Sequence, residues 1–293
     1  MPERINGWLI IDKPGGITSR DAVDRALRWF PRGTRIGHTG TLDPLATGVL
    51  VLAIGNATRL TEYVQQMTKV YEAGIILGAA SDTDDADGAI LPTPNANAPS
   101  RADIETALAS FVGVIAQTPP AHSAAKVGGR RAYDLARQGK DVALAPRPVA
   151  IHRIELRGYA YPRLDIVVTC GKGTYIRSLA RDLGQRLGVG GYIAALRRTE
   201  VGVFHASNGL SLDAPREEAR RRLLPIEHAL QHLPSIALAE PELARFCKGQ
   251  RVELPMGVAI DSGEAMIVSQ SGEFTAIAAV IDGVLKPERV FVT

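Results

Sequence analysis

The sequence predicts an α+β protein with a mixed, mostly antiparallel central sheet flanked by helices, followed by a small C-terminal β module. Segments with strand and helix patterns follow one another without the regular alternation that builds a parallel sheet. Of the 293 residues, 45% are hydrophobic and 22% are charged, which is usual for a folded domain and excludes disorder as the dominant state. Apolar runs stay far below the roughly 20 residues of a membrane helix, so no membrane partner is expected.

The first part of the chain supplies the elements of the central sheet. Residues 8–12 form an apolar run that ends at a Lys-Pro-Gly-Gly turn, and Thr18 or Ser19 then caps a helix whose apolar face reaches Phe30. Further strands are expected at 49–54, 70–77, 149–156, 164–170 and 193–204. Further helices are expected at 56–66, 100–111, 174–187 and 212–233.

A change in composition near Pro234 predicts a domain boundary. The preceding residues, 212–233, are charged and have a helical pattern, and Pro234 interrupts it. The residues that follow form short apolar runs separated by Gly, Ser and Asp, which is typical of a small β domain. We therefore expect one domain at 1–233 and a second at 234–293.

Basic residues are clustered although the formal net charge is only +3, from 34 Lys and Arg against 31 Asp and Glu. Residues 126–147 hold six basic residues and two aspartates, and residues 177–198 hold five arginines and one aspartate. Clusters of this kind favour a polyanionic partner. The alternative for either cluster alone is a solvated helix face.

The sequence contains no recognisable cofactor or metal motif. Two cysteines, Cys170 and Cys247, cannot supply a disulfide framework or a four-thiolate zinc site. The segment 171–176 lacks the third glycine of a dinucleotide-binding loop. The N-terminus also lacks the basic and apolar pattern of a signal peptide. We therefore expect a cytoplasmic enzyme or binding protein, and these segments indicate no cofactor or metal site.

One loop stands out as a candidate site. Within 35–50, three glycines and three threonines surround His38 and Asp43, and Pro44 follows the aspartate. Glycines allow the backbone to approach a ligand, and the proline restricts the backbone of Asp43. A carboxylate on a stiff loop before a buried strand can act as a nucleophile or base. The alternative is an aspartate that accepts hydrogen bonds from turn amides.

The same loop, Gly37–Leu50, resembles the catalytic motif of the bacterial tRNA pseudouridine synthase B family. Other blocks of the chain resemble that family in the same order: 12–19, 69–71, 81–88, 117–139, 173–184 and 196–199. Together they extend over about residues 7–204, and a chance match to so many ordered blocks is improbable.

The resemblance implies an enzyme that isomerises uridine to pseudouridine at position 55 of the tRNA T loop. It implies the pseudouridine synthase fold, a base flipped out of the RNA and no cofactor, since nothing is oxidised and no group is donated. It also implies an RNA-gripping thumb at about 117–147 and a C-terminal module, 234–293, that resembles an RNA-binding PUA domain.

The resemblance also implies a role for each matching residue. Asp43 is the expected catalytic carboxylate, and Arg177 is expected to hold it ionised through a two-pronged hydrogen bond. Tyr71 is expected to pack against the target base as part of the catalytic set. The remaining expected substrate-binding residues are His38, which helps to hold the flipped arrangement, Tyr175 and Leu196, which line the uracil pocket, Lys13 and Pro14 near the site, and Lys126, Arg130 and Arg131 in the thumb.

Two alternatives share these features. A guide-dependent pseudouridine synthase of a ribonucleoprotein has the same motifs, but such subunits carry N-terminal extensions, whereas here the Asp12-Lys13-Pro14 motif comes early. A non-catalytic RNA chaperone would not need Asp43, Tyr71 and Arg177, although these residues are compatible with an added tRNA-folding activity. We expect a monomer that requires no protein partner and binds the T stem-loop of tRNA.

Overall fold

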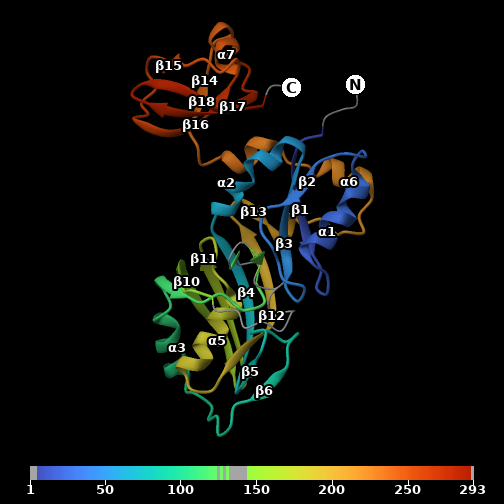
Figure 1. Cartoon of the computed structure of the whole chain (residues 1–293), viewed down its shortest axis with the longest axis vertical. Coiled ribbons are helices and arrows are strands. Elements are labelled where there is room, and N and C mark those ends of the chain that lie inside the picture. The colour runs from blue at the N-terminus through green and yellow to red at the C-terminus, as the bar shows by residue number, and fades with distance from the viewer. Residues whose placement is uncertain (1–4, 124–125, 128–129, 132–143, 292–293) are drawn as a thin grey trace.

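The computed structural model describes residues 5–123, 126–127, 130–131 and 144–291, and its main feature is a nine-stranded sheet (Figure 1). Seven strands follow in the order β1 (Gly7–Lys13), β3 (Thr47–Ile54), β12 (Gly191–Val201), β4 (Lys69–Leu77), β11 (Arg163–Cys170), β10 (Arg147–Ala160) and β7 (Gly113–Gln117). Two short strands, β2 (Ile36–His38) and β13 (Phe204–His205), pair with β3 and β12. Neighbouring strands of this sheet are antiparallel except β3 and β12, so the predicted fold class is confirmed.

Helices and short hairpins surround the sheet. The α-helices of this part are α1 (Ser19–Ala26), α2 (Thr61–Gln66), α3 (Arg101–Ala109), α5 (Ile176–Arg186) and α6 (Arg216–Arg221). The 3-10 helices are η1 (Leu27–Trp29), η2 (Gly55–Leu60), η3 (Ala206–Asn208) and η4 (Ile226–Leu230), and the hairpins are β5 (Ala79–Ser81) with β6 (Ile90–Pro92) and β8 (Lys126–Val127) with β9 (Arg130–Arg131). Within the described part of the chain, no helix is long and apolar enough to cross a membrane.

Two helices begin at the capping residues that the sequence indicates, whereas the prediction of one other helix is wrong. Thr18 and Ser100 each form a reciprocal capping box with the aspartate three residues later, as their side chains favour. The helix expected over 212–233 is instead only the short α6 and η4. Two prolines, Pro215 and Pro225, precede these elements, and the backbone of Leu224 exchanges hydrogen bonds with Trp8 on the edge strand β1. That backbone therefore cannot also form helical hydrogen bonds.

The C-terminal residues form a second, five-stranded sheet. Its strand order is β14 (Ser235–Ala237), β16 (Ser262–Val268), β17 (Phe274–Ile281), β18 (Val284–Val290) and β15 (Val252–Glu253), and α7 (Glu240–Cys247) accompanies it. We call residues 235–291 the C-terminal module. It has its own hydrophobic cluster, but Ile277 and Phe291 also join a cluster with Leu60 and Val64 of the first part. The module is therefore packed against the first part and shares core residues with it.

The junction of β3 and β12 positions the loop that carries Asp43. Gly48 at the start of β3 has φ +96° and lies opposite Arg198 of β12. A Cβ atom at Gly48 would lie 2.1 Å from the carbonyl oxygen of Arg198. Only glycine combines this backbone conformation with so close an approach.

We expect Gly48→Ala to lower the free energy of unfolding by at least about 2 kcal/mol, because it adds both backbone strain and a backbone clash. Urea denaturation measures the change. Gly37→Ala is the matched control, since Gly37 has no positive φ and no atom near its Cβ position, and it should change stability by less than about 0.5 kcal/mol. Equal effects of the two changes would contradict this explanation.

Candidate active site

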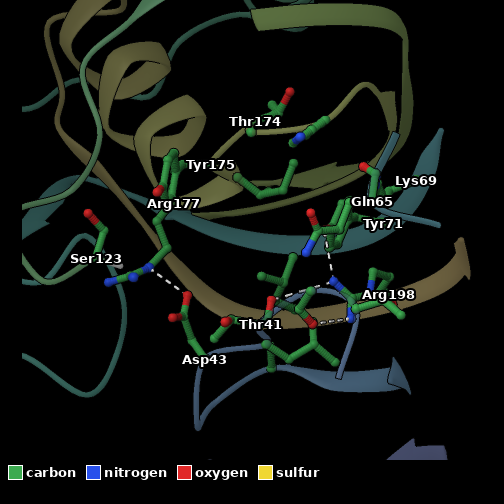
Figure 2. Close-up of a pocket in the computed structure, with 18 of the residues that line it drawn as sticks. Thr41, Asp43, Gln65, Lys69, Tyr71, Ser123, Thr174, Tyr175, Arg177 and Arg198 are labelled. Atoms are coloured by element: carbon green, nitrogen blue, oxygen red, sulfur yellow. Dashed lines mark hydrogen bonds and ion pairs between the residues drawn. The ribbon is translucent and has the colours of Figure 1, made fainter. Parts of the chain in front are cut away.

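A cavity of about 510 Å³ opens where the loop before β3 faces β4, β12 and the loop before α5 (Figure 2). Its lining includes six of the predicted site residues. Four lie on the sheet and its loops, namely His38, Asp43, Tyr71 and Leu196, and two lie at the start of α5, namely its N-cap Tyr175 and Arg177.

An ion pair joins Asp43 and Arg177 at one end of the cavity (Figure 2). The Nε atom of Arg177 lies 3.0 Å from Oδ2 of Asp43, and the arginine side chain is only 5% exposed while that of Asp43 is 37% exposed. Arg177 is the second residue of α5, whose buried face includes Ile176, Leu179 and Leu183. The helix therefore holds the guanidinium group in place, and the carboxylate remains open to the cavity.

The guanidinium group of Arg177 is divided among several acceptors, so the expected two-pronged hydrogen bond to Asp43 is absent. Its Nη1 atom lies 3.2 Å from Oδ2 of Asp85 and donates to the carbonyl of Thr83 at 2.8 Å, and its Nη2 atom donates to the carbonyl of His122 at 2.9 Å. Only Nε is left for Asp43. The physical reason is that the two buried terminal nitrogens take the acceptors nearest to them, whereas Nε contacts Asp43 only as an ion pair, without the geometry of a hydrogen bond.

The pKa of Asp43 is raised above the usual value of an aspartate. Burial is the largest cause, and the nearby negative charge of Asp85 adds to it, whereas the positive charges of Arg177 and Lys13 act in the opposite direction. The expected ionising effect of Arg177 is therefore present, but burial outweighs it.

Asp85 was not among the predicted site residues, although it lies in a block that the sequence analysis singled out. It is 5% exposed and accepts hydrogen bonds from the Thr83 hydroxyl at 2.6 Å and from the Asp87 amide at 3.2 Å. An aspartate-rich turn gives no local sign of which carboxylate points inward, so only the tertiary structure identifies it.

Arg198 is a second residue that the prediction missed. It is 3% exposed, and its guanidinium group donates to the carbonyls of Val49 at 2.8 Å and Gly40 at 3.1 Å. It also lies 3.5 Å from the Tyr71 hydroxyl. Arg198 thus ties the loop before Asp43 to Tyr71 of β4. Burial raises the pKa of the Tyr71 phenol, and Arg198 opposes that rise.

Lys13 and Pro14 lie behind the loop rather than in the lining of the cavity. Lys13 is fully buried and donates to the carbonyls of Pro14 and Ile17, both at 2.8 Å, and of Pro44 at 3.3 Å. Burial lowers the pKa of its ammonium group to about 8. Lys13 therefore supports the backbone directly after Asp43, and Pro14 is exposed.

The expected thumb residues lie on the hairpin of β8 and β9. Lys126 pairs with Arg131 in its register, and Val127 pairs with Arg130. Much of the expected thumb, residues 124–125, 128–129 and 132–143, lies outside the described residues.

Lys69 and Gln65 line the other end of the cavity and were not predicted as site residues. Lys69 is 9% exposed, and its ammonium group donates to the carbonyls of Gln65 and Met67 at the end of α2. Burial lowers the pKa of Lys69 to about 8. Neither residue type nor sequence spacing predicts the contact between Lys69 and these carbonyls, because it depends on how α2 packs.

The described residues contain no group of three or more His, Cys, Asp and Glu side chains that could hold a metal ion. The chemistry available in the cavity is that of a carboxylate beside a buried arginine, with Tyr71, Tyr175 and Leu196 as apolar surfaces for a planar ligand. A carboxylate so held can attack or stabilise a sugar or a base during transfer at a glycosidic bond.

Comparison with known proteins identifies the class of enzyme. The fold is shared with a chain in the crystal structure of a Cbf5–Nop10–Gar1 complex, at a TM-score of 0.73 and 24% identity over 98% of this chain and 85% of that chain. A model described as the TruB family pseudouridylate synthase N-terminal domain matches residues 28–176. Two C-terminal models, for tRNA pseudouridylate synthase B and for pseudouridine synthase II TruB, match 177–231 and 234–291.

Curated relatives agree with these models. A protein of Paracoccus denitrificans named tRNA pseudouridine synthase B is 43% identical over 98% of this chain and 96% of its own length. Proteins with the same name from Xanthomonas axonopodis pv. citri and Rhodospirillum rubrum are each 42% identical over 98% of this chain, and over 94% and 97% of their own lengths. The protein is a pseudouridine synthase, an isomerase. The chain belongs to the TruB family, as the sequence analysis predicted.

We expect Asp85→Asn to lower the pKa of Asp43, because the change removes a like charge and leaves Arg177 with one carboxylate fewer to balance. The titration of the Asp43 carboxyl carbon by nuclear magnetic resonance measures the shift, and Asp43→Asn assigns the signal. Asp87→Asn, an exposed aspartate of the same turn, is the control and should leave the titration unchanged. An unchanged or higher pKa in Asp85→Asn would refute this account of the site.

Proposed function

We propose that the protein isomerises uridine 55 in the T loop of tRNA to pseudouridine, with Asp43 as the catalytic carboxylate. The observation that carries the proposal is the partly open carboxylate of Asp43, paired with buried Arg177 in a cavity that Tyr71, Tyr175 and Leu196 also line. The names of the relatives support tRNA as the substrate. Position 55 and the T loop rest on the family motifs in the sequence.

The reaction needs no external reagent. The bond between the sugar carbon C1′ and N1 of uracil breaks, the base turns, and C1′ forms a bond to C5. The proton on C5 is lost and N1 gains one, so atoms and electrons balance without an oxidant or a donated group. Asp43 acts on the sugar or the base while the bond is broken, and Arg177 fixes the direction of its carboxylate.

The target base must leave the stack of the T loop before it can reach Asp43, which costs a few kcal/mol. Packing of the uracil against Tyr71, Tyr175 and Leu196 offsets part of this cost, and His38 helps to hold the opened RNA. Phosphate contacts from Lys126, Arg130 and Arg131 offset more of it. We assign a further RNA contact to the PUA-like C-terminal module.

We further propose that a single chain acts in the cytoplasm without a guide RNA or a protein partner. The decisive experiment incubates the purified chain alone with unmodified tRNA and maps pseudouridine along the product. Pseudouridine at position 55 supports the proposal, whereas modification that requires a separate guide RNA would favour the guide-dependent alternative.

We expect Asp43→Asn to abolish turnover while the affinity for tRNA stays within a few-fold of wild type. Asparagine keeps the shape of the side chain but cannot act as a nucleophile or base, and the expected phosphate contacts lie elsewhere. Single-turnover pseudouridine formation and filter binding measure the two quantities, with Asp87→Asn as a control for loss of one exposed carboxylate. Turnover near that of wild type would show that Asp43 is not the catalytic group.

We expect Arg177→Lys to slow the single-turnover rate at saturating tRNA by at least about tenfold, which corresponds to roughly 1.4 kcal/mol of barrier. A lysine has one charged nitrogen and cannot contact Asp43, Asp85 and the two backbone carbonyls in the geometry that the planar group provides. Binding should remain nearly unchanged. A folded variant with the wild-type rate would mean that Arg177 balances charge without orienting Asp43.

A further inference from the structure

The short helix α2 lies at the end of the first part that is nearest to the C-terminal module (Figure 1), and one of its residues, Gln65, lines the cavity of the candidate active site. It has six residues, Thr61–Gln66, and an isolated helix of that length is unstable in water. Its position must therefore be set by the surfaces that pack against it.

One side of α2 and the preceding η2 contacts the C-terminal module. The Tyr63 hydroxyl donates to Glu264 at 2.6 Å, and the guanidinium group of Arg289 lies 5.2 Å from the centre of the Tyr63 ring. Arg59 of η2 donates to the Val290 carbonyl at 2.7 Å and lies over the Phe291 ring at 4.5 Å.

These polar contacts surround a shared apolar cluster. Leu60 and Val64 are fully buried, and they belong to the same cluster as Ile277 and Phe291 of the module. The contact is therefore a packed interface, and a change in it displaces α2 rather than only exposing a surface charge.

The other side of α2 forms part of the cavity. Gln65 follows Tyr63 by two residues, which is about 200° around a helix, and its side chain lines the cavity. The carbonyls of Gln65 and Met67 accept hydrogen bonds from the ammonium group of Lys69, which also lines the cavity (Figure 2). A displacement of α2 would therefore move Gln65 and both acceptors of Lys69.

We propose that the C-terminal module positions the Gln65–Lys69 side of the active-site cavity by holding α2. The module thus contributes to the geometry of the cavity in the free enzyme, in addition to the RNA contact assigned to it. Tyr63 and Phe291 act as positioning residues, because they reach the cavity only through α2. This inference does not depend on the identity of the RNA substrate.

Lys69 provides the readout. Its ammonium group titrates at about 8 because burial lowers its pKa most, with Arg198 and Lys172 adding to the effect and Cys170 opposing it. If α2 moves away, water reaches the ammonium group and the largest cause of the shift weakens. The pKa of Lys69 should then rise toward the usual value of a lysine.

The experiment uses the full chain labelled with ¹³C and ¹⁵N in its lysines, without RNA, and follows the Lys69 side-chain signal from pH 6 to pH about 11. Lys69→Arg assigns the signal. Phe291→Leu and Glu264→Ala weaken the interface from the side of the module, and Glu264 is exposed, so its replacement should not unfold the protein.

Each variant has a matched control in the same module. Phe246→Leu replaces a fully buried phenylalanine of α7 in the module's own cluster, and Glu253→Ala removes an exposed carboxylate of β15. We expect both interface variants to raise the titration midpoint of Lys69 and both controls to leave it unchanged, even where Phe246→Leu lowers the melting temperature. An unchanged midpoint in both interface variants, or an equal rise in a control, would overturn the proposal.

Discussion

The structure of the site depends on the burial of one arginine between two aspartates. Arg177 is 5% exposed and lies 3.0 Å from Asp43 and 3.2 Å from Asp85. Burying a charge in this way is unfavourable unless opposite charges and hydrogen-bond acceptors compensate for the lost water. The Thr83 and His122 carbonyls accept hydrogen bonds from its two terminal nitrogens, so the loop of Asp43, the acidic turn and the first residues of the expected thumb all meet at the start of α5. The position of the Asp43 carboxylate therefore depends on its ion pair with the buried Arg177.

A second buried arginine organises the opposite wall in the same way. Arg198 extends from β12 to carbonyls of Val49 and Gly40 and lies near the Tyr71 hydroxyl. It can reach them because β12 lies between β3 and β4, parallel to one and antiparallel to the other. The loop that carries Asp43 is therefore attached through Arg198 to the strand that carries Tyr71. Both walls use buried charge to hold irregular backbone, which requires specific acceptors rather than apolar packing alone.

The C-terminal module takes part in this arrangement through α2. Its own cluster would allow it to be regarded as a separate unit, but Ile277 and Phe291 also bury Leu60 and Val64. The domain boundary that the sequence indicates near Pro234 is therefore not a boundary in the packing of the hydrophobic core. In the mechanism that we propose, the module contacts the RNA and also positions the Gln65–Lys69 side of the cavity that receives the target base.

The sequence by itself determined the fold class, the helix starts near Thr18 and at Ser100, most strands of the central sheet and the family, because these depend on local side-chain chemistry, on hydrophobic period and on ordered motifs. It also indicated several residues of the cavity, since Asp43, Tyr71, Tyr175, Arg177 and Leu196 lie in those motifs. Only the tertiary structure decided that the guanidinium group of Arg177 is divided, that Lys13 supports the loop from behind and that Leu224 pairs with Trp8 instead of continuing a helix. The physical reason is that each of these depends on which donors and acceptors meet across the fold, and buried polar groups take partners according to spatial proximity rather than sequence spacing.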